Sequence, residues 1–209
     1  MIIVGAGGCA KQFLPSLLRK DILKQCLFYD DITQDKGGFI HQNFNLIRSE
    51  EDLKKRILSG DKQFIIAIGS PVLRKSFFEK IEALGGEPAS LIDPKSSISE
   101  FDVKLNHGIV ILEGVIIETG AQVGKGCLVN LRAILAHDCL IGDFCELSPG
   151  SILLGGCEIG DNTFVGAGAV VLPKVIVGKN CIIGAGSIVT KDLPDHSKVA
   201  GVPARALDL

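Results

Sequence analysis

The sequence predicts two domains, a small α/β domain of the Rossmann type followed by a parallel β-helix built from six-residue repeats. Aliphatic residues occupy every sixth position from Leu105 to Val189 without a break, whereas the residues before position 93 alternate short apolar runs with helical patterns. An α-helix repeats every ~3.6 residues and an isolated strand every ~2, so a sustained period of six is itself the fold signal.

The residues around each aliphatic position favour a coil with three short sides. The position two residues before it is mostly small, and the position after it is often glycine, which suits a corner because glycine has no Cβ. Three six-residue sides make one coil of eighteen residues. We therefore expect each aliphatic side chain to point inward and to stack on its counterpart eighteen positions away.

Composition excludes several classes of protein. The 209 residues carry a net charge of −2 with mixed signs, which leaves no basic surface for nucleic acid. The longest uncharged run, from Asn162 to Pro173, is shorter than the roughly 20 residues that span a membrane, and the N-terminus lacks the basic segment of a signal peptide. Five of the seven cysteines fall in the small inward position of the repeat. We expect buried free thiols and a cytoplasmic location.

The N-terminus has the order of a nucleotide-binding βαβ unit. The first four residues are a short apolar run, Gly5–Ala10 form a glycine-rich turn, and a helical pattern follows. In such a unit the turn and the helix N-terminus direct backbone N–H groups toward a phosphate. The candidate contacts are Gly7, Gly8 and Cys9. Because Ala10 replaces the third glycine of the usual motif, a simple tight turn is the alternative.

Two further predicted strands end at the same edge of the sheet. Leu27–Tyr29 end in Asp30 and Asp31, at about the distance after the turn, ~20 residues, where an acid meets a ribose or sugar hydroxyl. Phe64–Ile68 end at Gly69, and helices are expected from residue 49 and over 72–84. These strand ends would line a ligand site, although the aspartates alone are also what the start of a loop would contain.

Ala89 to Ser97 are expected to link the two domains, with the boundary at Asp93-Pro94, because proline restricts the residue before it and often marks a boundary. The α/β domain would then cover 1–92 and the β-helix with its tail 93–209.

Inside the repeat are only two of the four histidines, His107 and His137. Their separation of thirty is not a multiple of eighteen, so they lie at different places around the coil. A trihistidine metal site would also need two histidines close in sequence, and that pair is absent, so we expect no metal.

His137 is the candidate general base. The residues eighteen positions before and after it are Thr119 and Gly155, and both such neighbours of Asp138 are glycines. Small neighbours leave a notch beside the imidazole, and a carboxylate next to a histidine fixes its tautomer and raises its basicity. The alternative is a solvated corner histidine between ordinary turn glycines.

Several motifs together resemble one family over essentially the whole chain. They are the glycine turn, F-Y-D-D, A-I-G-S, A-H-D-C-L-I-G-D-F, and the ending V-A-G-V-P-A-R at Val199–Arg205. The chain resembles the hexapeptide-repeat sugar O- and N-acetyltransferases of the sialic acid O-acetyltransferase family, including the bacillosamine N-acetyltransferase. The resemblance implies a left-handed β-helix, acetyl-CoA as co-substrate, a homotrimer, and His137 as the base with Asp138 as its partner.

The resemblance also implies contacts with both substrates. The sugar-nucleotide contacts would be Gly7, Gly8, Cys9, Asp30, Asp31 and Gly69. The acetyl-CoA contacts would be Gly155, Ala167 and Ala185, with Glu146 as a further contact. The chain has Cys9 and Glu146 where many members have histidines.

We expect direct acetyl transfer to the amine of a nucleotide-linked amino sugar, with His137 taking the proton and a backbone N–H near Gly155 supporting the oxyanion. Two alternatives remain open at this point. One is O-acetylation of a sialic acid or another free sugar, and the other is a hexapeptide scaffold without catalytic activity.

Overall fold

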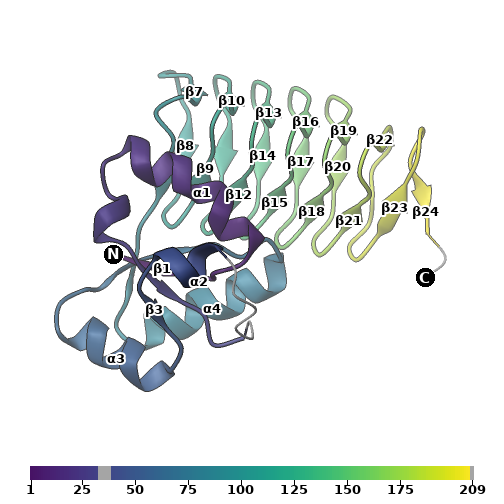
Figure 1. Cartoon of the computed structure of the whole chain (residues 1–209). Coiled ribbons are helices and arrows are strands. Elements are labelled where there is room, and N and C mark those ends of the chain that lie inside the picture. The colour runs from purple at the N-terminus through teal and green to yellow at the C-terminus, as the bar shows by residue number, and fades with distance from the viewer. Residues whose placement is uncertain (33–38, 208–209) are drawn as a thin grey trace.

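The computed structural model describes residues 1–32 and 39–207, apart from the side chains of Phe39 and His41. The α/β domain packs against one side of a long three-sided prism (Figure 1). Its five strands are all parallel, in the order β3-β2-β1-β4-β5. They are β1 (Ile2–Val4), β2 (Leu27–Tyr29), β3 (Leu46–Ile47), β4 (Gln63–Ile66) and β5 (Glu87–Pro88).

Helices cover both faces of this sheet. They are α1 (Gly8–Arg19), η1 (Leu23–Gln25), α2 (Phe39–Asn43), α3 (Glu50–Leu58) and α4 (Pro71–Ala83). On one face α1 packs Phe13 and Leu17 against the side of the sheet that holds Ile3, and on the other face α4 packs Phe78 against Phe64. Serine side chains cap α3 and α4, as polar N-cap residues commonly do. No helix within residues 1–32 and 39–207 has the length and apolar content to cross a membrane.

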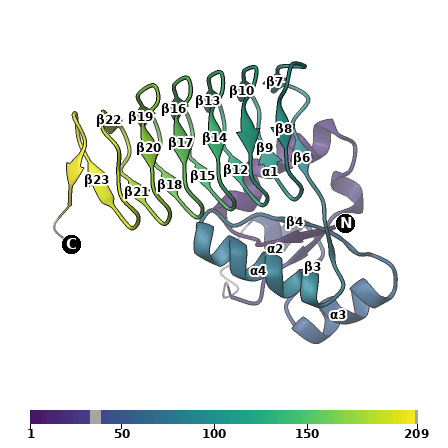
Figure 2. The same cartoon turned by 180° about the vertical axis from the view of Figure 1, so that it is seen from behind.

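The prism has three faces of short parallel strands, and Figure 2 shows the coils from behind. The first face contains β7 (Ser97–Ile98), β10 (Ile116–Ile117), β13 (Ile134–Leu135), β16 (Ile152–Leu153), β19 (Val170–Val171) and β22 (Ile188–Val189). The second contains β8 (Lys104–Leu105), β11 (Gln122–Val123), β14 (Leu140–Ile141), β17 (Glu158–Ile159) and β20 (Ile176–Val177). The third contains β6 (Leu91–Ile92), β9 (Val110–Ile111), β12 (Leu128–Val129), β15 (Glu146–Leu147), β18 (Phe164–Val165), β21 (Ile182–Ile183), β23 (Lys198–Ala200) and the antiparallel β24 (Arg205–Ala206).

The repeat predicted the interior of the prism correctly. The sixth-position aliphatic residues from Ile111 to Val189 and the five cysteines of the small position are buried in one continuous core, and Leu105 packs against it partly buried. Most neighbouring strands pair eighteen residues apart, as in Val129 with Leu147. The first coil differs, because Ile116 pairs with Ser97, nineteen positions away, so one extra residue sits in the corner before β8.

The chain enters the prism inside the predicted linker of residues 89–97. Strand β6 begins at Leu91 and pairs with β9 of the prism, and the Leu91 N–H donates to the Ile109 carbonyl at 2.9 Å. The chain therefore enters the prism between β5 and β6, before Asp93-Pro94. Proline restricts local backbone angles but does not mark where hydrogen bonding to another sheet begins.

The α/β domain is docked on the third face by a shared apolar core. Leu91, Val110 and Leu128 project outward from that face and pack in the same cluster as Phe13 of α1 and Ile3 of β1. These outward positions would face water in an isolated prism. Their burial therefore fixes the position of the α/β domain along the prism.

Arg74 of α4 crosses the domain boundary and is 1% exposed. Its guanidinium donates to carbonyl groups of both domains and to the buried carboxylate of Glu146 at 3.2 Å. The carbonyl acceptors, all at 2.8–2.9 Å, belong to Ile68, Gly69, Gly126, Phe144 and Cys145. One buried side chain thus ties the start of α4 to two coils of the prism.

We expect Arg74→Met to lower the free energy of unfolding by about 3–5 kcal/mol, because the change leaves Glu146 buried without its cation. Lys75→Met is the matched control, since the neighbouring Lys75 side chain is 43% exposed. Urea denaturation followed by circular dichroism at one protein concentration measures both. Equal stability of the two variants would show that Arg74 does not hold the domains together.

Candidate active site

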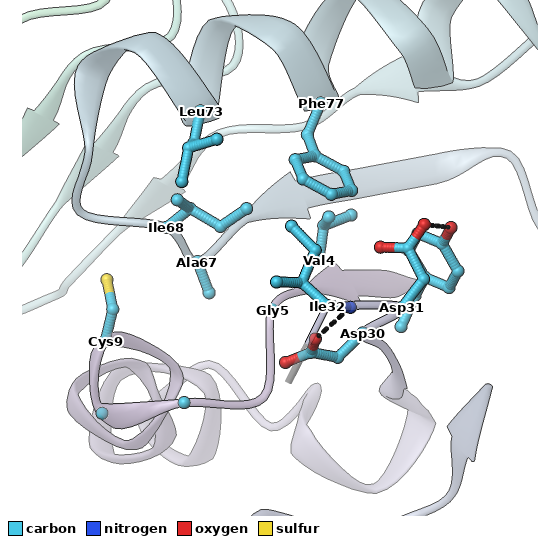
Figure 3. Close-up of a pocket in the computed structure, with 13 residues that line it drawn as sticks. Val4, Gly5, Cys9, Asp30, Asp31, Ile32, Ala67, Ile68, Leu73 and Phe77 are labelled. Atoms are coloured by element: carbon cyan, nitrogen blue, oxygen red, sulfur yellow. Dashed lines mark hydrogen bonds between the residues drawn. The ribbon is translucent and has the colours of Figure 1, made fainter. Parts of the chain in front are cut away.

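A cavity of about 210 Å³ lies where β1, β2 and β4 end, beside the first turns of α1 and α4 (Figure 3). Five of the six predicted substrate contacts line it, namely Gly7, Gly8, Cys9, Asp30 and Asp31. The sixth, Gly69, does not line it, although the adjacent Ile68 does. The topology of a parallel sheet explains this grouping, because the carboxyl ends of its strands share one edge.

The opposite wall of the cavity is apolar and was missed in the sequence. Ile68, Leu73 and Phe77 point into the cavity across from the glycine turn (Figure 3). Leu73 and Phe77 are four residues apart on α4 and so share one face of the helix. The same spacing is typical of a helix face packed in a core, so the sequence carried no separate signal for a ligand wall.

The glycine turn presents an uncapped helix N-terminus to the cavity. Gly7 is the N-cap of α1, with no side-chain cap and no acidic residue in the first turn. A Cβ added at Gly7 or Gly8 would meet no atom within 4 Å, so the turn borders open space. Gly5 has a φ of +106° and approaches the Ala67 carbonyl so closely that a Cβ there would lie 2.7 Å from its oxygen. The turn therefore suits a phosphate group.

Asp30 is buried and holds the glycine turn in place. Its carboxylate accepts the N–H of Ala6 at 2.9 Å and the N–H of Ile32 at 3.1 Å. The bond from Ala6 joins the ends of β1 and β2. Asp30 thus lines the cavity and holds the glycine turn next to the end of β2.

Asp31 lies at the rim of the cavity in a network of charged groups. Its carboxylate accepts the Tyr29 hydroxyl at 2.6 Å and the Lys80 ammonium at 3.2 Å, and Lys80 also binds Glu50 at 2.9 Å. Burial, followed by the hydrogen bond to Asp31, raises the pKa of Tyr29 to about 12. Tyr29 therefore stays a neutral donor that orients the Asp31 carboxylate.

Behind Cys9 lies the buried carboxylate of Glu146, which is 3% exposed. It accepts from Arg74 and, at 3.4 Å, from the Asn130 amide. Burial raises the pKa of Glu146 to about 7, against the lowering effect of Arg74. Burial, and then the charge of Glu146, raises the pKa of Cys9 to about 12. Glu146 thus has a structural contact in this chain, and its contact with a cofactor stays a prediction.

His137 occupies the corner between the first and second faces, between β13 and β14. Its side chain is 65% exposed, and Nδ1 lies 2.9 Å from the Asp138 carboxylate. Asp138 has a φ of +59°, which turns the chain back so that its carboxylate reaches the ring of the preceding residue. The hydrogen bond to Asp138 raises the pKa of His137 above its ordinary value, with a smaller contribution from the charge of Glu118.

Gly155 makes room for the imidazole. A Cβ at Gly155 would lie 2.4 Å from His137 Nε2, so glycine is required for the ring to take this position. Thr119 and Glu118 border the ring from the preceding coil, in a groove that also includes Ser99. The ring therefore fills the space over Gly155, and the groove lies on the side of the preceding coil. Glu118 was not predicted, because it lies nineteen positions before His137 and not eighteen.

Ala167 and Ala185 lie at a different corner, between the third and first faces. Both are exposed, and the Gly186 N–H donates to the Ala167 carbonyl at 2.8 Å, so the two stack on successive coils. A Cβ at Gly168 or Gly186 would meet nothing within 4 Å. Ala167, Gly168, Ala185 and Gly186 thus form a strip without large side chains, which fits an extended pantetheine arm. Gly155 lies at another corner and does not belong to this strip within one chain.

One chain does not bring the cavity and the base together. The α/β domain with its cavity is docked on the third face, whereas His137 lies at the opposite corner, between the first and second faces. The prism core separates them. Glu146 and the corner residues Ala167 and Ala185 border the third face, on the same side as the cavity. His137 and Gly155 lie at the corner away from it.

Comparisons with known proteins agree with this division into two domains. Residues 1–81 match the family described as PglD N-terminal domain, and residues 156–191 match bacterial transferase hexapeptide (six repeats).

Three solved structures illustrate the similarity. The chain is 31% identical to perosamine N-acetyltransferase from Caulobacter crescentus, solved as a histidine-to-asparagine variant with CoA and GDP-perosamine, with a TM-score of 0.90 over 99% of this chain and 95% of that chain. It is 30% identical to the acetyltransferase domain of PglB from Neisseria gonorrhoeae FA1090, with a TM-score of 0.88 over 99% and 98%. It is 27% identical to WeeI from Acinetobacter baumannii AYE, with a TM-score of 0.86 over 99% and 98%.

These similarities extend over almost the full length of both chains, and they identify the prism as a left-handed parallel β-helix of hexapeptide repeats. We conclude that the chain belongs to the family of hexapeptide-repeat sugar N-acetyltransferases that carry a PglD-type N-terminal domain.

Proposed function

We propose that this protein transfers an acetyl group from acetyl-CoA to the amine of a nucleotide-linked amino sugar. The observation that carries the proposal is the His137 ring, which is exposed, bound through Nδ1 to Asp138, and placed with Nε2 over Gly155. The similarity to an amino-sugar N-acetyltransferase over 99% of the chain supports the same reaction.

The cavity of the α/β domain binds the sugar nucleotide. The uncapped N-terminus of α1 receives the diphosphate, the wall formed by Leu73 and Phe77 contacts the apolar faces of the nucleotide, and Asp31 accepts hydroxyl or N–H donors at the rim. We assign Gly7, Gly8 and Cys9 to the phosphate end.

Acetyl-CoA, when bound, supplies an acetyl group activated as a thioester. The strip at Ala167 and Ala185 holds its pantetheine arm, because neither corner carries a side chain larger than a methyl group. Glu146 is assigned as a further contact with either substrate.

His137 Nε2 accepts the proton that the amine loses as its nitrogen bonds to the thioester carbonyl carbon. Asp138 stabilises the imidazolium, and the backbone N–H near Gly155 stabilises the oxyanion. The carbon–sulfur bond then breaks, and the imidazolium returns the proton to the thiolate. No acyl-enzyme forms on a prism cysteine, because all five are buried in the core.

The site requires more than one copy of the chain, and we infer a homotrimer. The base of one copy meets the cavity and the pantetheine strip of the next, because these halves lie on opposite sides of each prism. A cyclic trimer completes all its sites by the same contact. The buried free thiols favour a cytoplasmic location.

A panel of nucleotide-linked 4-amino sugars and free sialic acids, incubated with acetyl-CoA and analysed by mass spectrometry, tests the acceptor. Acetylation of an amino sugar and none of a sialic acid is the expected result. The reverse pattern would replace this proposal with O-acetylation.

We expect His137→Ala to lower kcat by about 10²–10⁴-fold, the usual contribution of a general base. His107→Ala is the matched control, because His107 is also exposed on the prism but is bound to Asn106 and not to an aspartate. Release of CoA measures turnover, and circular dichroism checks the fold. Wild-type turnover in His137→Ala would remove the base assignment.

The rate should fall as the pH falls through the raised pKa of His137, because only the neutral imidazole accepts a proton. In Asp138→Asn the largest cause of that raised pKa is lost, so the acid limb of kcat/KM should move to lower pH. Its maximal rate should fall less than in His137→Ala. The substrate amine titrates in the same way with the wild type and with Asp138→Asn, so it cannot cause a difference between their pH profiles. If the acid limb of kcat/KM lies at the same pH in both, Asp138 does not act on His137.

Mixed oligomers test whether two copies share a site. His137→Ala lacks the base, and Ile68→Trp should fill the cavity, so each variant alone should be inactive. Co-expression should restore activity, because a mixed trimer contains a site with an intact cavity from one copy and an intact base from another. If the mixture is as inactive as its components, the site lies within one chain.

A further inference from the structure

Corner N–H groups of the prism are capped by side chains of the following coil. At the corner between the second and third faces, the Lys125 N–H donates to Asp143 at 2.9 Å, and the Asp143 N–H donates to Asp161 at 3.0 Å. The Lys179 N–H donates to Asp195 at 2.8 Å in the same way. Each cap satisfies a polar group that the strands leave unpaired.

The same cap is impossible at His137. The equivalent residue of the following coil is Gly155, which has no side chain to accept the His137 N–H. A side chain there would also collide with the ring, since a Cβ would lie 2.4 Å from Nε2. The residue that leaves room for the His137 ring therefore cannot give its backbone the support that Asp143, Asp161 and Asp195 give at the other corner.

Glu118 supplies that support from the preceding coil. Its Oε2 accepts the His137 N–H at 3.0 Å, across the first-to-second-face corner. The side chain borders a groove of about 320 Å³ that runs beside the imidazole and is also lined by Ser99 and Thr119. The hydroxyls of Ser99 and Thr119 lie 3.0 Å apart, which holds this side of the groove together.

We propose that Glu118 is a positioning residue for the general base, which fixes the His137 backbone so that the imidazole stays over Gly155 and adds a second negative charge beside it. The inference rests on the proposed function, because it assigns His137 the role of base. It goes further by naming a residue that neither the repeat nor the predicted His-Asp pair indicated.

The charged groups around the His137 ring all raise its pKa. The titratable groups that influence His137 are Asp138, Glu118 and Cys139, and each raises its pKa, while desolvation opposes them. Thr119 and Gly155, which border the ring from the coils on either side, carry no charge. Loss of the Glu118 charge should therefore lower the pKa of His137.

Two substitutions separate the charge from the hydrogen bond. Glu118→Gln keeps an oxygen that accepts the His137 N–H but removes the charge, whereas Glu118→Asp keeps the charge but shortens the reach by one carbon. Glu158→Gln on β17 is the matched control, as another exposed carboxylate of the prism that makes no bond to His137.

The first readout is an NMR titration of the histidine ring protons, in which the resonance missing from His137→Ala identifies His137. We expect its pKa to fall in Glu118→Gln and to stay unchanged in Glu118→Asp and Glu158→Gln. The second readout is kcat with saturating substrates. We expect about a tenfold loss in Glu118→Asp, since a small displacement of a catalytic group is costly.

An unchanged His137 pKa in Glu118→Gln, or wild-type kcat in Glu118→Asp, would overturn the assignment. The titration needs no acceptor sugar, so it tests Glu118 separately from the reaction. A wild-type protein that acetylates nothing would instead overturn the proposed function, whatever the titration shows.

Discussion

The buried guanidinium of Arg74 is the contact on which the arrangement of the two domains depends. An arginine that is 1% exposed has lost its hydration, so each N–H must find an acceptor in the protein. Arg74 finds them in the loop that ends β4, in two corners of the prism, and in Glu146. Of these acceptors, Ile68 also lines the cavity of the α/β domain. The same side chain that joins the domains therefore also shapes the site.

A second constraint comes from the geometry of stacked coils. Corners must satisfy their backbone polar groups, and at the corner between the second and third faces Lys125, Asp143 and Lys179 do so with an aspartate of the next coil. At the equivalent position next to His137 the residue is Gly155, which leaves room for the ring but cannot cap the backbone. The capping bond then comes from Glu118 on the other side. Exposure of the base and support of its backbone are thus provided by different coils.

The third feature is the separation of the site into halves. A rigid prism has one core, and groups at opposite corners cannot approach each other through it. A reaction that needs both a cavity on the third face and a base at the far corner must therefore use a neighbouring copy. The Glu146 carboxylate, whose pKa burial raises to about 7, lies on the third face, where the α/β domain is docked.

The sequence by itself determined the interior of the prism and indicated His137 as the candidate base. A period of six leaves one solution for the aliphatic positions, and the eighteen-residue coil then places Thr119 and Gly155 on either side of His137. The sequence also predicted that the glycine turn and the aspartates after β2 lie together, because a parallel sheet brings the carboxyl ends of its strands to one edge. Only the tertiary structure showed the features that follow no repeat in the sequence. These are the entry into the prism at Leu91, the hydrogen bonds of Arg74 and Glu118, and the apolar cavity wall at Phe77. These contacts join segments whose spacing follows no repeat, so no pattern along the chain could predict them.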